Sequence, residues 1–122
     1  MLSFVATPIG NLGDITIRAL EVLRAADFIA CEDTRETVKI LKHYEIPEKQ
    51  FLSYHEHSPE IRVHEILAQV RQGKRVAVVT DGGMPSISDP GFTLVREAIR
   101  EGVPFEVLPG PSAVLTALVA SG

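Results

Sequence analysis

The chain has 122 residues, which is enough for one domain with a sizeable buried core. Its net charge of −4 gives the domain as a whole no electrostatic attraction to nucleic acid, and its single cysteine excludes an internal disulfide and a zinc site built from cysteines. The sequence begins without the basic segment of a signal peptide and has no apolar run near the roughly 18 residues of a membrane span, so we expect a cytoplasmic protein.

Five short apolar runs predict β-strands, at residues 2–6, 28–31, 51–53, 76–79 and 105–108. A segment that is suited to a helix follows each run. Because single helices separate successive strands, the strands cannot pair as hairpins. We therefore predict one α/β domain over residues 1–122, with a five-stranded, mostly parallel sheet and helices on both of its faces.

Capping residues and apolar stripes define the predicted helices. The helix starts are marked by Asp14, Thr34, Ser58 with Pro59, Asp89 with Pro90, and Pro111. The third helix carries an apolar stripe of Val63, Ile66, Leu67 and Val70. The stripe of the fourth consists of Phe92, Val95, Ala98 and Ile99, and that of the fifth consists of Val114, Leu115 and Leu118. We expect these stripes to face the sheet.

Nearly all of the chemically unusual residues follow the carboxyl ends of the predicted strands. They fall in residues 7–14, 32–35, 54–57, 80–89 and 109–112, whereas the opposite edge has plain turns at residues 24–27, 47–50, 72–75 and 101–104. In a parallel sheet the carboxyl ends of all strands share one edge, and open α/β folds bind ligands there. This asymmetry predicts a ligand site at the carboxyl edge.

Two of these segments have the composition of ligand-binding loops. Residues 7–14 form a turn with one proline and two glycines at the head of a helix, which suits a ligand lying close to the main chain. The turn lacks Gly-x-Gly-x-x-Gly and Gly-Lys-Ser/Thr, so a dinucleotide loop and a P-loop are disfavoured, while a purely structural turn stays open. Asp81, Gly82 and Gly83 lie in a long loop that either admits a nucleoside or is a flexible turn with a capping carboxylate.

The other segments carry titratable side chains. His55 is a candidate polar contact or base, because histidine titrates near neutral pH. A metal site at His55 and His57 is disfavoured, because the sequence offers no third ligand with a matching spacing. Glu32, Asp33 and Arg35 form either a functional group or a local ion pair with a helix cap. A nucleophilic serine is disfavoured because Gly-x-Ser-x-Gly is absent.

Five segments, in order along the chain, resemble one known family. They are residues 5–16, 32–35, 53–57, 88–91 and 108–113, and they are similar to the small-subunit ribosomal RNA methyltransferase I family of the tetrapyrrole methylase superfamily. The resemblance implies S-adenosylmethionine as cofactor and the ribose 2′-hydroxyl of a cytidine in 16S rRNA as methyl acceptor. It also implies two α/β domains with the cofactor between them. Residues 1–122 would be the N-terminal domain, inactive without the absent C-terminal one.

The resemblance also assigns cofactor contacts to individual residues. The implied contacts are Ile9, Asp81, Gly82, Gly83, Met84, Ile87, Ser112 and Ala113. Met84 departs from the family, which usually has Asp-Ala-Gly-Thr-Pro where this chain has residues 81–85. A threonine hydroxyl is therefore missing at this position, although backbone contacts to the cofactor would survive.

Methylation of a ribose hydroxyl needs help, because the hydroxyl is a poor nucleophile near neutral pH. His55 is the first candidate base, followed by Glu32 and Asp33. Arg35 and Asn11 are candidate contacts to the RNA. The expected partner is 16S rRNA or the small ribosomal subunit, held mainly by the absent domain. A homodimer is also expected, and no metal.

Two other classes of function stay open from the residues. One is a non-catalytic α/β module that binds a nucleotide. The other is a dinucleotide-binding domain in which Asp33, about 20 residues after Gly13, accepts the ribose hydroxyls. The missing third glycine counts against the dinucleotide domain. Titration with S-adenosylmethionine and with NAD, together with an rRNA methylation assay, separates all three classes.

Overall fold

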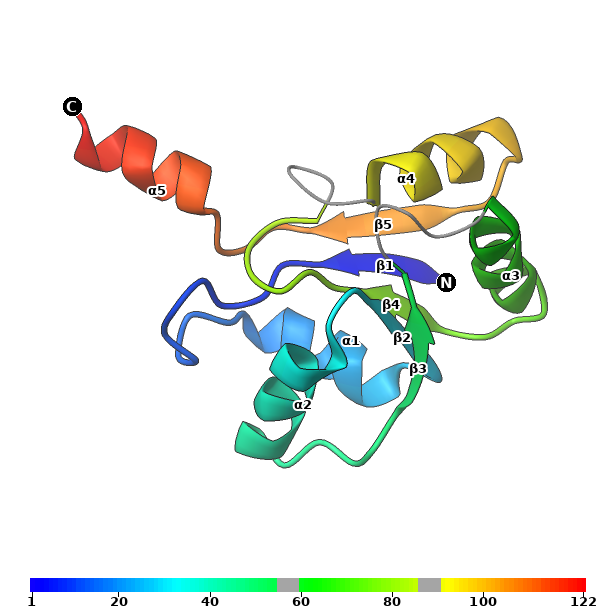
Figure 1. Ribbon diagram of the computed structural model, residues 1–122, viewed down its shortest axis with the longest axis horizontal. Helices are drawn as coiled ribbons and strands as arrows, with labels where there is room; N and C mark the ends of the chain where they lie inside the picture. The colour runs from blue at the N-terminus through cyan, green and yellow to red at the C-terminus, as the bar shows by residue number, and fades with distance from the viewer. Residues whose placement is uncertain (55–59, 86–90) are drawn as a thin grey trace.

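Strands and helices alternate along the computed structural model, which describes residues 1–54, 60–85 and 91–122 (Figure 1). The strands are β1 (Leu2–Val5), β2 (Phe28–Cys31), β3 (Gln50–Ser53), β4 (Val76–Val78) and β5 (Phe105–Leu108). The helices are α1 (Ile17–Ala25), α2 (Thr34–His43), α3 (Glu60–Arg71), α4 (Gly91–Arg100) and α5 (Ala113–Ala120). The predicted strands are therefore confirmed, with small differences at their ends.

The sheet has the strand order β3-β2-β4-β1-β5, and every strand pair in it is parallel. In the register, Leu2 of β1 lies beside both Val76 of β4 and Phe105 of β5. The predicted α/β fold with a parallel sheet is thus confirmed. Because all strands run in the same direction, the loops after β1, β4 and β5 leave from one edge (Figure 1).

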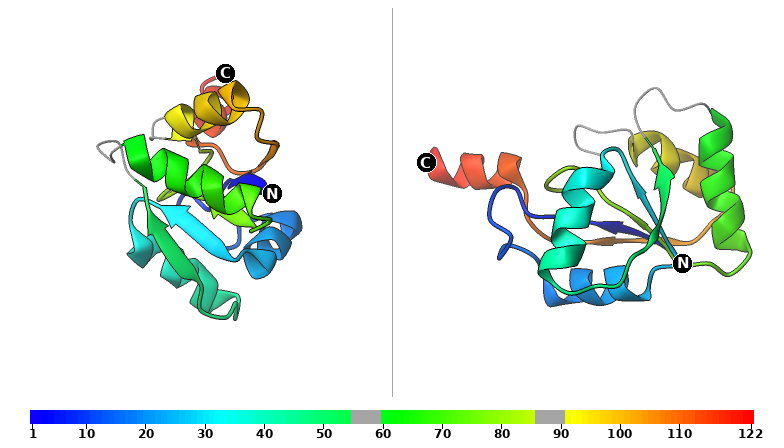
Figure 2. Two further views of the ribbon diagram at one scale, coloured as in Figure 1. Left: turned by 90° about the vertical axis from the view of Figure 1, so that its right-hand side faces the viewer. Right: turned by 60° about the horizontal axis from the view of Figure 1, so that its bottom comes forward.

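Helices cover both faces of the sheet, as predicted, and bury a separate apolar core on each (Figures 1 and 2). Residues of β1 alternate between the two cores, with Leu2 and Phe4 in one and Val5 in the other. The core under α3 and α4 takes in the predicted stripe of Val63, Ile66, Leu67 and Val70. The core under α1 and α2 contains Cys31, whose burial raises the pKa of its thiol and fits a structural residue.

The predicted stripes of α4 and α5 are wrong in part. In α4, Leu94 and Ala98 are buried, but Phe92 and Ile99 are 57% and 65% exposed. In α5, none of the predicted inward residues is buried, and the exposed fractions of Val114, Leu115 and Leu118 are 60%, 61% and 64%. The helix projects from the carboxyl edge of the sheet, away from the other helices (Figure 1). Every residue of α5 except Thr116 is apolar, and none of them is buried among the described residues.

Two predicted helix caps and one predicted helix start differ in the structure. Thr16, and not Asp14, caps α1, since its hydroxyl accepts a hydrogen bond from the Ala19 amide at 3.0 Å. The Asp14 amide closes a turn onto the Asn11 carbonyl, and this turn delays the helix. Asp33 caps α2 in place of Thr34, which is already helical. The last helix, α5, starts at Ala113 and not at Pro111, and Ser112 caps it. The predicted caps at residues 58 and 89 lie outside the described residues.

Within the described residues, no helix is long and apolar enough to cross a membrane.

Candidate functional site

The loops after β1 and β4 are joined at the carboxyl edge. We call residues 6–16 the first loop and residues 79–85 the fourth loop. Thr7 and Gly83 exchange two backbone hydrogen bonds, with N···O distances of 3.1 Å from the Thr7 amide and 2.8 Å from the Gly83 amide. The two loops therefore form a short antiparallel bridge at the edge where the ligand site was predicted.

Two threonine hydroxyls reinforce this bridge. The Thr7 hydroxyl donates to the Thr80 carbonyl at 3.3 Å, and the Thr80 hydroxyl donates to the Gly83 carbonyl at 3.3 Å. The Gly82 amide in turn donates to the Thr80 hydroxyl at 3.1 Å. Both threonines are buried. Sequence reasoning missed them, although a threonine directly after each of two neighbouring strands was a visible signal.

The glycines of these loops allow the segments to approach one another. Gly83 has a φ of +86°, and a β-carbon on it would lie 3.3 Å from Cγ2 of Ile9. A β-carbon on Gly110, in the fifth loop (residues 109–112), would lie 2.8 Å from the β-carbon of Ala6. These glycines are thus required by contacts within the protein. A contact from Gly83 to a cofactor stays a prediction.

An open depression of about 490 Å³ lies between the first loop, the start of α1, the fifth loop and α5. Its lining residues are Ile9, Gly13, Asp14, Ile15, Thr16, Gly110, Pro111 and Thr116. Ile9 was a predicted cofactor contact, and Ser112 and Ala113 follow Pro111 directly. The sequence did not indicate the other lining residues as cofactor contacts. They come together only because the first loop lies near the start of α5.

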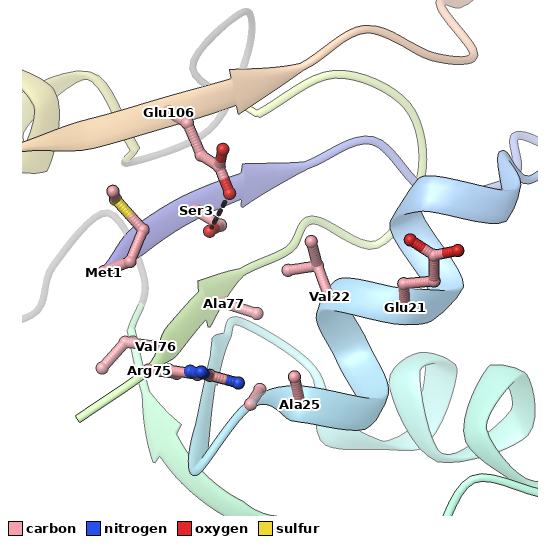
Figure 3. Close-up of a pocket in the computed structure, with 10 residues that line it drawn as sticks. Met1, Ser3, Glu21, Val22, Ala25, Arg75, Val76, Ala77 and Glu106 are labelled. Atoms are coloured by element: carbon pink, nitrogen blue, oxygen red, sulfur yellow. Dashed lines mark hydrogen bonds between the residues drawn. The ribbon is translucent and has the colours of Figure 1, made fainter.

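A smaller depression of about 230 Å³ lies beside α1, near the amino ends of β1 and β4 (Figure 3). The Ser3 hydroxyl there donates to the Glu106 carboxylate at 2.8 Å, and Arg18 pairs with the same carboxylate at 3.0 Å. None of the described residues that were predicted as site residues lines this depression. The carboxyl edge therefore remains the candidate site.

The second loop (residues 32–33) and the start of α2 hold a local ion pair. The Asp33 carboxylate accepts hydrogen bonds from the Arg35 amide at 2.9 Å and from the Arg35 guanidinium at 3.1 and 2.9 Å. These bonds lower the pKa of Asp33 and raise that of Arg35. A carboxylate with a lowered pKa is a weaker base, so the structure favours the cap-and-pair interpretation of Asp33. Glu32 is exposed beside it.

The remaining predicted site residues lie in the fourth loop, the first loop and the start of α5, or outside the described residues. Asp81 and Gly82 are exposed and Met84 is half-buried in the fourth loop. The Ser112 hydroxyl accepts from the Leu115 amide at 3.3 Å and caps α5, next to the exposed Ala113. The side chain of Asn11 accepts from the Gly13 amide at 2.8 Å within the first loop. His55 and Ile87 lie outside the described residues.

One group of described side chains has the composition of a metal site. His64 of α3, Glu97 of α4 and Glu101, which directly follows α4, place ligand atoms within 4.8 Å of one another. The two carboxylates, however, already accept from Arg100 at 2.7 Å and from Arg71 at 2.6 Å. The group is therefore accounted for as an ion-pair network between two helices.

Comparison with known proteins decides the family. The family described as "Tetrapyrrole (Corrin/Porphyrin) Methylases" matches residues 1–122, the whole of the chain. The chain belongs to the tetrapyrrole methylase family. This agrees with the resemblance seen in the sequence motifs.

Two curated relatives of this chain are named ribosomal RNA small subunit methyltransferase I. The relative from Hydrogenobaculum sp. is 54% identical over 121 residues, which cover 99% of this chain and 53% of the relative. The relative from Thermotoga maritima is 52% identical over 121 residues, which cover 99% of this chain and 54% of the relative. The chain thus spans about half the length of these relatives.

Solved structures of tetrapyrrole methylases confirm the fold. Cobalt precorrin-4 methyltransferase, a cobalamin biosynthetic enzyme, matches with a TM-score of 0.75 at 27% identity, over 98% of this chain and 49% of that one. Uroporphyrin-III-C-methyltransferase from Thermus thermophilus matches with a TM-score of 0.72 at 25% identity, over 92% of this chain and 48% of that one.

Proposed function

We propose that this chain is part of an S-adenosylmethionine-dependent enzyme that methylates small-subunit ribosomal RNA. The observation that carries the proposal is the 54% identity, across 99% of the chain, to a ribosomal RNA small subunit methyltransferase I. On the basis of the motif resemblance, the proposed methyl acceptor is the ribose 2′-hydroxyl of a cytidine in 16S rRNA. A ribosomal substrate also implies a cytoplasmic location.

The residues at the carboxyl edge fit such a cofactor. The depression there combines the backbone of two glycine-containing loops with the apolar side chain of Ile9, and this mixture suits a nucleoside that is bound largely by main-chain groups. When bound, the cofactor supplies a methyl group on a sulfonium. The first, fourth and fifth loops would hold its two ends, with Ile9, Gly83 and Ser112 among the contacts. The main contribution of the protein to such a reaction is to align the methyl group with the hydroxyl that attacks it.

His55 is the proposed base, and Glu32 is the next candidate, because the Asp33 carboxylate is held by Arg35. His55→Ala should lower the rate of the chemical step by about 10²- to 10⁴-fold and remove one limb of the pH–rate profile. Single-turnover methylation with saturating RNA and cofactor measures both. An unchanged rate and pH profile would remove His55 from the mechanism and make Glu32 the residue to test.

The function itself is tested with the intact protein, unmethylated small ribosomal subunits and cofactor labelled in the methyl group. We expect label in 16S rRNA, and 2′-O-methylcytidine after digestion to nucleosides. Label that enters RNA at a base would overturn the acceptor. Binding of NAD with no affinity for S-adenosylmethionine would favour the dinucleotide-binding domain, and cofactor binding with no methyl transfer would favour the non-catalytic module.

We also propose that, in a protein as long as the relatives, the part that this chain does not span packs against α5. The chain spans about half of those relatives, and α5 presents exposed Leu115 and Leu118 beside the candidate site. Residues 1–122 alone should then bind S-adenosylmethionine much more weakly than the intact protein. Isothermal titration calorimetry of both tests this, and equal affinities would contradict the proposal.

A further inference from the structure

Tyr44 connects the end of α2 to the first loop. Its hydroxyl donates a hydrogen bond to the backbone carbonyl of Leu12, 32 residues earlier in the chain. The ring is half-buried against the core under α1 and α2, and the His43 ring packs edge-on against it with centroids 4.8 Å apart. The hydroxyl is therefore presented to the loop by a side chain whose own position is fixed.

The other hydrogen bonds near Leu12 act inside the loop. The Asn11 side chain accepts from the Gly13 amide at 2.8 Å, and the Asn11 carbonyl accepts from the Asp14 amide at 2.9 Å. Such bonds fix the shape of the turn but not its place on the domain. The bond from Tyr44 has its donor on another element, so it fixes where the turn lies.

Leu12 stands between two residues that line the depression at the carboxyl edge, Ile9 and Gly13. Tyr44 does not line the depression itself. Moving the Leu12 carbonyl would therefore shift one wall of the depression, while the opposite wall at Pro111 stays in place. A residue in this arrangement supports a binding loop without lining the binding site itself.

We propose that Tyr44 is a positioning residue for S-adenosylmethionine, which it serves by holding the first loop in its binding position. This inference rests on the proposed function. It assigns a role in the site to Tyr44, the residue that directly follows α2.

Tyr44→Phe in the intact protein removes the hydroxyl and keeps the ring in the core. We expect the Kd for S-adenosylmethionine to rise about three- to tenfold, the usual effect of one lost hydrogen bond. The KM for the cofactor should rise equally, and kcat at saturating cofactor should not change, because Tyr44 touches no reacting atom. The amide of Gly13 should exchange hydrogen faster in the variant, and saturating cofactor should restore its protection.

Ser3→Ala is the matched control, because it also removes one hydroxyl hydrogen bond but at the smaller depression near α1. It should leave the Kd for the cofactor unchanged. A Tyr44→Phe variant with wild-type Kd and wild-type exchange at Gly13 would overturn the inference. So would a Ser3→Ala variant with the same rise in Kd, since the effect would then be general stability. Failure of the wild-type protein to bind S-adenosylmethionine would instead overturn the proposed function.

Discussion

The candidate site contains two regions that are built in different ways. The first, fourth and fifth loops are held by contacts between distant parts of the chain, such as the bridge from Thr7 to Gly83. The second loop is held by bonds between near neighbours, Asp33 and Arg35. A change in the first region should therefore alter stability and ligand binding together. A change in the second should alter the local charge and leave the rest of the site intact.

Among the changes that test this comparison, Gly83→Val should have the largest effect. The new side chain would be strained at a φ of +86° and crowded by Ile9, so we expect a loss of about 1–3 kcal/mol in the free energy of unfolding and weaker cofactor binding. Gly73→Val is the matched control, because Gly73 has a φ of +87° in open space at the other edge. It should cost stability without changing cofactor affinity. Urea unfolding and calorimetry measure the two quantities, and equal cofactor affinities in both variants would contradict the coupling.

A smaller and more selective effect should follow Arg35→Ala. We propose Arg35 as a contact to an RNA phosphate. Its loss should then weaken RNA binding and reduce the slope of log K against log salt by about one, with the affinity for S-adenosylmethionine unchanged. Arg100→Ala is the control, since Arg100 is also an exposed arginine paired with a carboxylate, but on α4. RNA binding measured at several salt concentrations checks this. If both variants reduce the slope equally, the second loop has no special place in RNA binding.

The smallest effect should follow Asp33→Asn, which keeps a side-chain oxygen for the cap of α2 but removes the charge. The pKa of Asp33 is lowered by Arg35, so the ion pair stabilises the fold at every pH above the ordinary aspartate pKa of about 3.9. This stabilisation by the ion pair disappears as the pH falls through the lowered pKa of Asp33 in the folded protein. The stability difference between wild type and variant should thus be constant near neutral pH and vanish in acid. Urea unfolding from neutral pH to about pH 2 measures it, and a difference that persists in acid would show that the charge is not its source.

The sequence was sufficient for the parallel direction of the strands and for the edge that carries the candidate site, but it did not predict the strand order. Single helices between strands require parallel pairing, and parallel pairing places the loops around Ile9, Gly83 and Ser112 at one edge. It was not sufficient for contacts such as that of Tyr44 with Leu12. Such contacts depend on the distance between segments far apart in the chain, and local patterns carry no information about that distance.

The helices α3 and α5 show the same limit for burial. Both carry an apolar stripe, and in α3 it is buried at Ile66 and Leu67, whereas in α5 Leu115 and Leu118 are exposed. Periodicity reports which side chains favour burial, and only the fold shows whether a surface is present to bury them. The predictions of the helix caps were wrong for a more local reason. Neighbouring polar residues compete for the same amides, and the turn at Asn11 moved the start of α1 past Asp14.

The strand order has a consequence for synthesis. Of these five strands β1 is made first, but its neighbours in the sheet are β4 and β5, and Leu2 pairs with Val76 and Phe105. β2 and β3, which are adjacent in the sheet, can pair much earlier. The apolar residues of β1 must wait until residues 105–108 have been made before both flanks are covered. Contacts of such long range slow folding and leave a strand open to wrong partners in the meantime. We therefore expect the sheet to be completed only after its last strand, β5, has emerged.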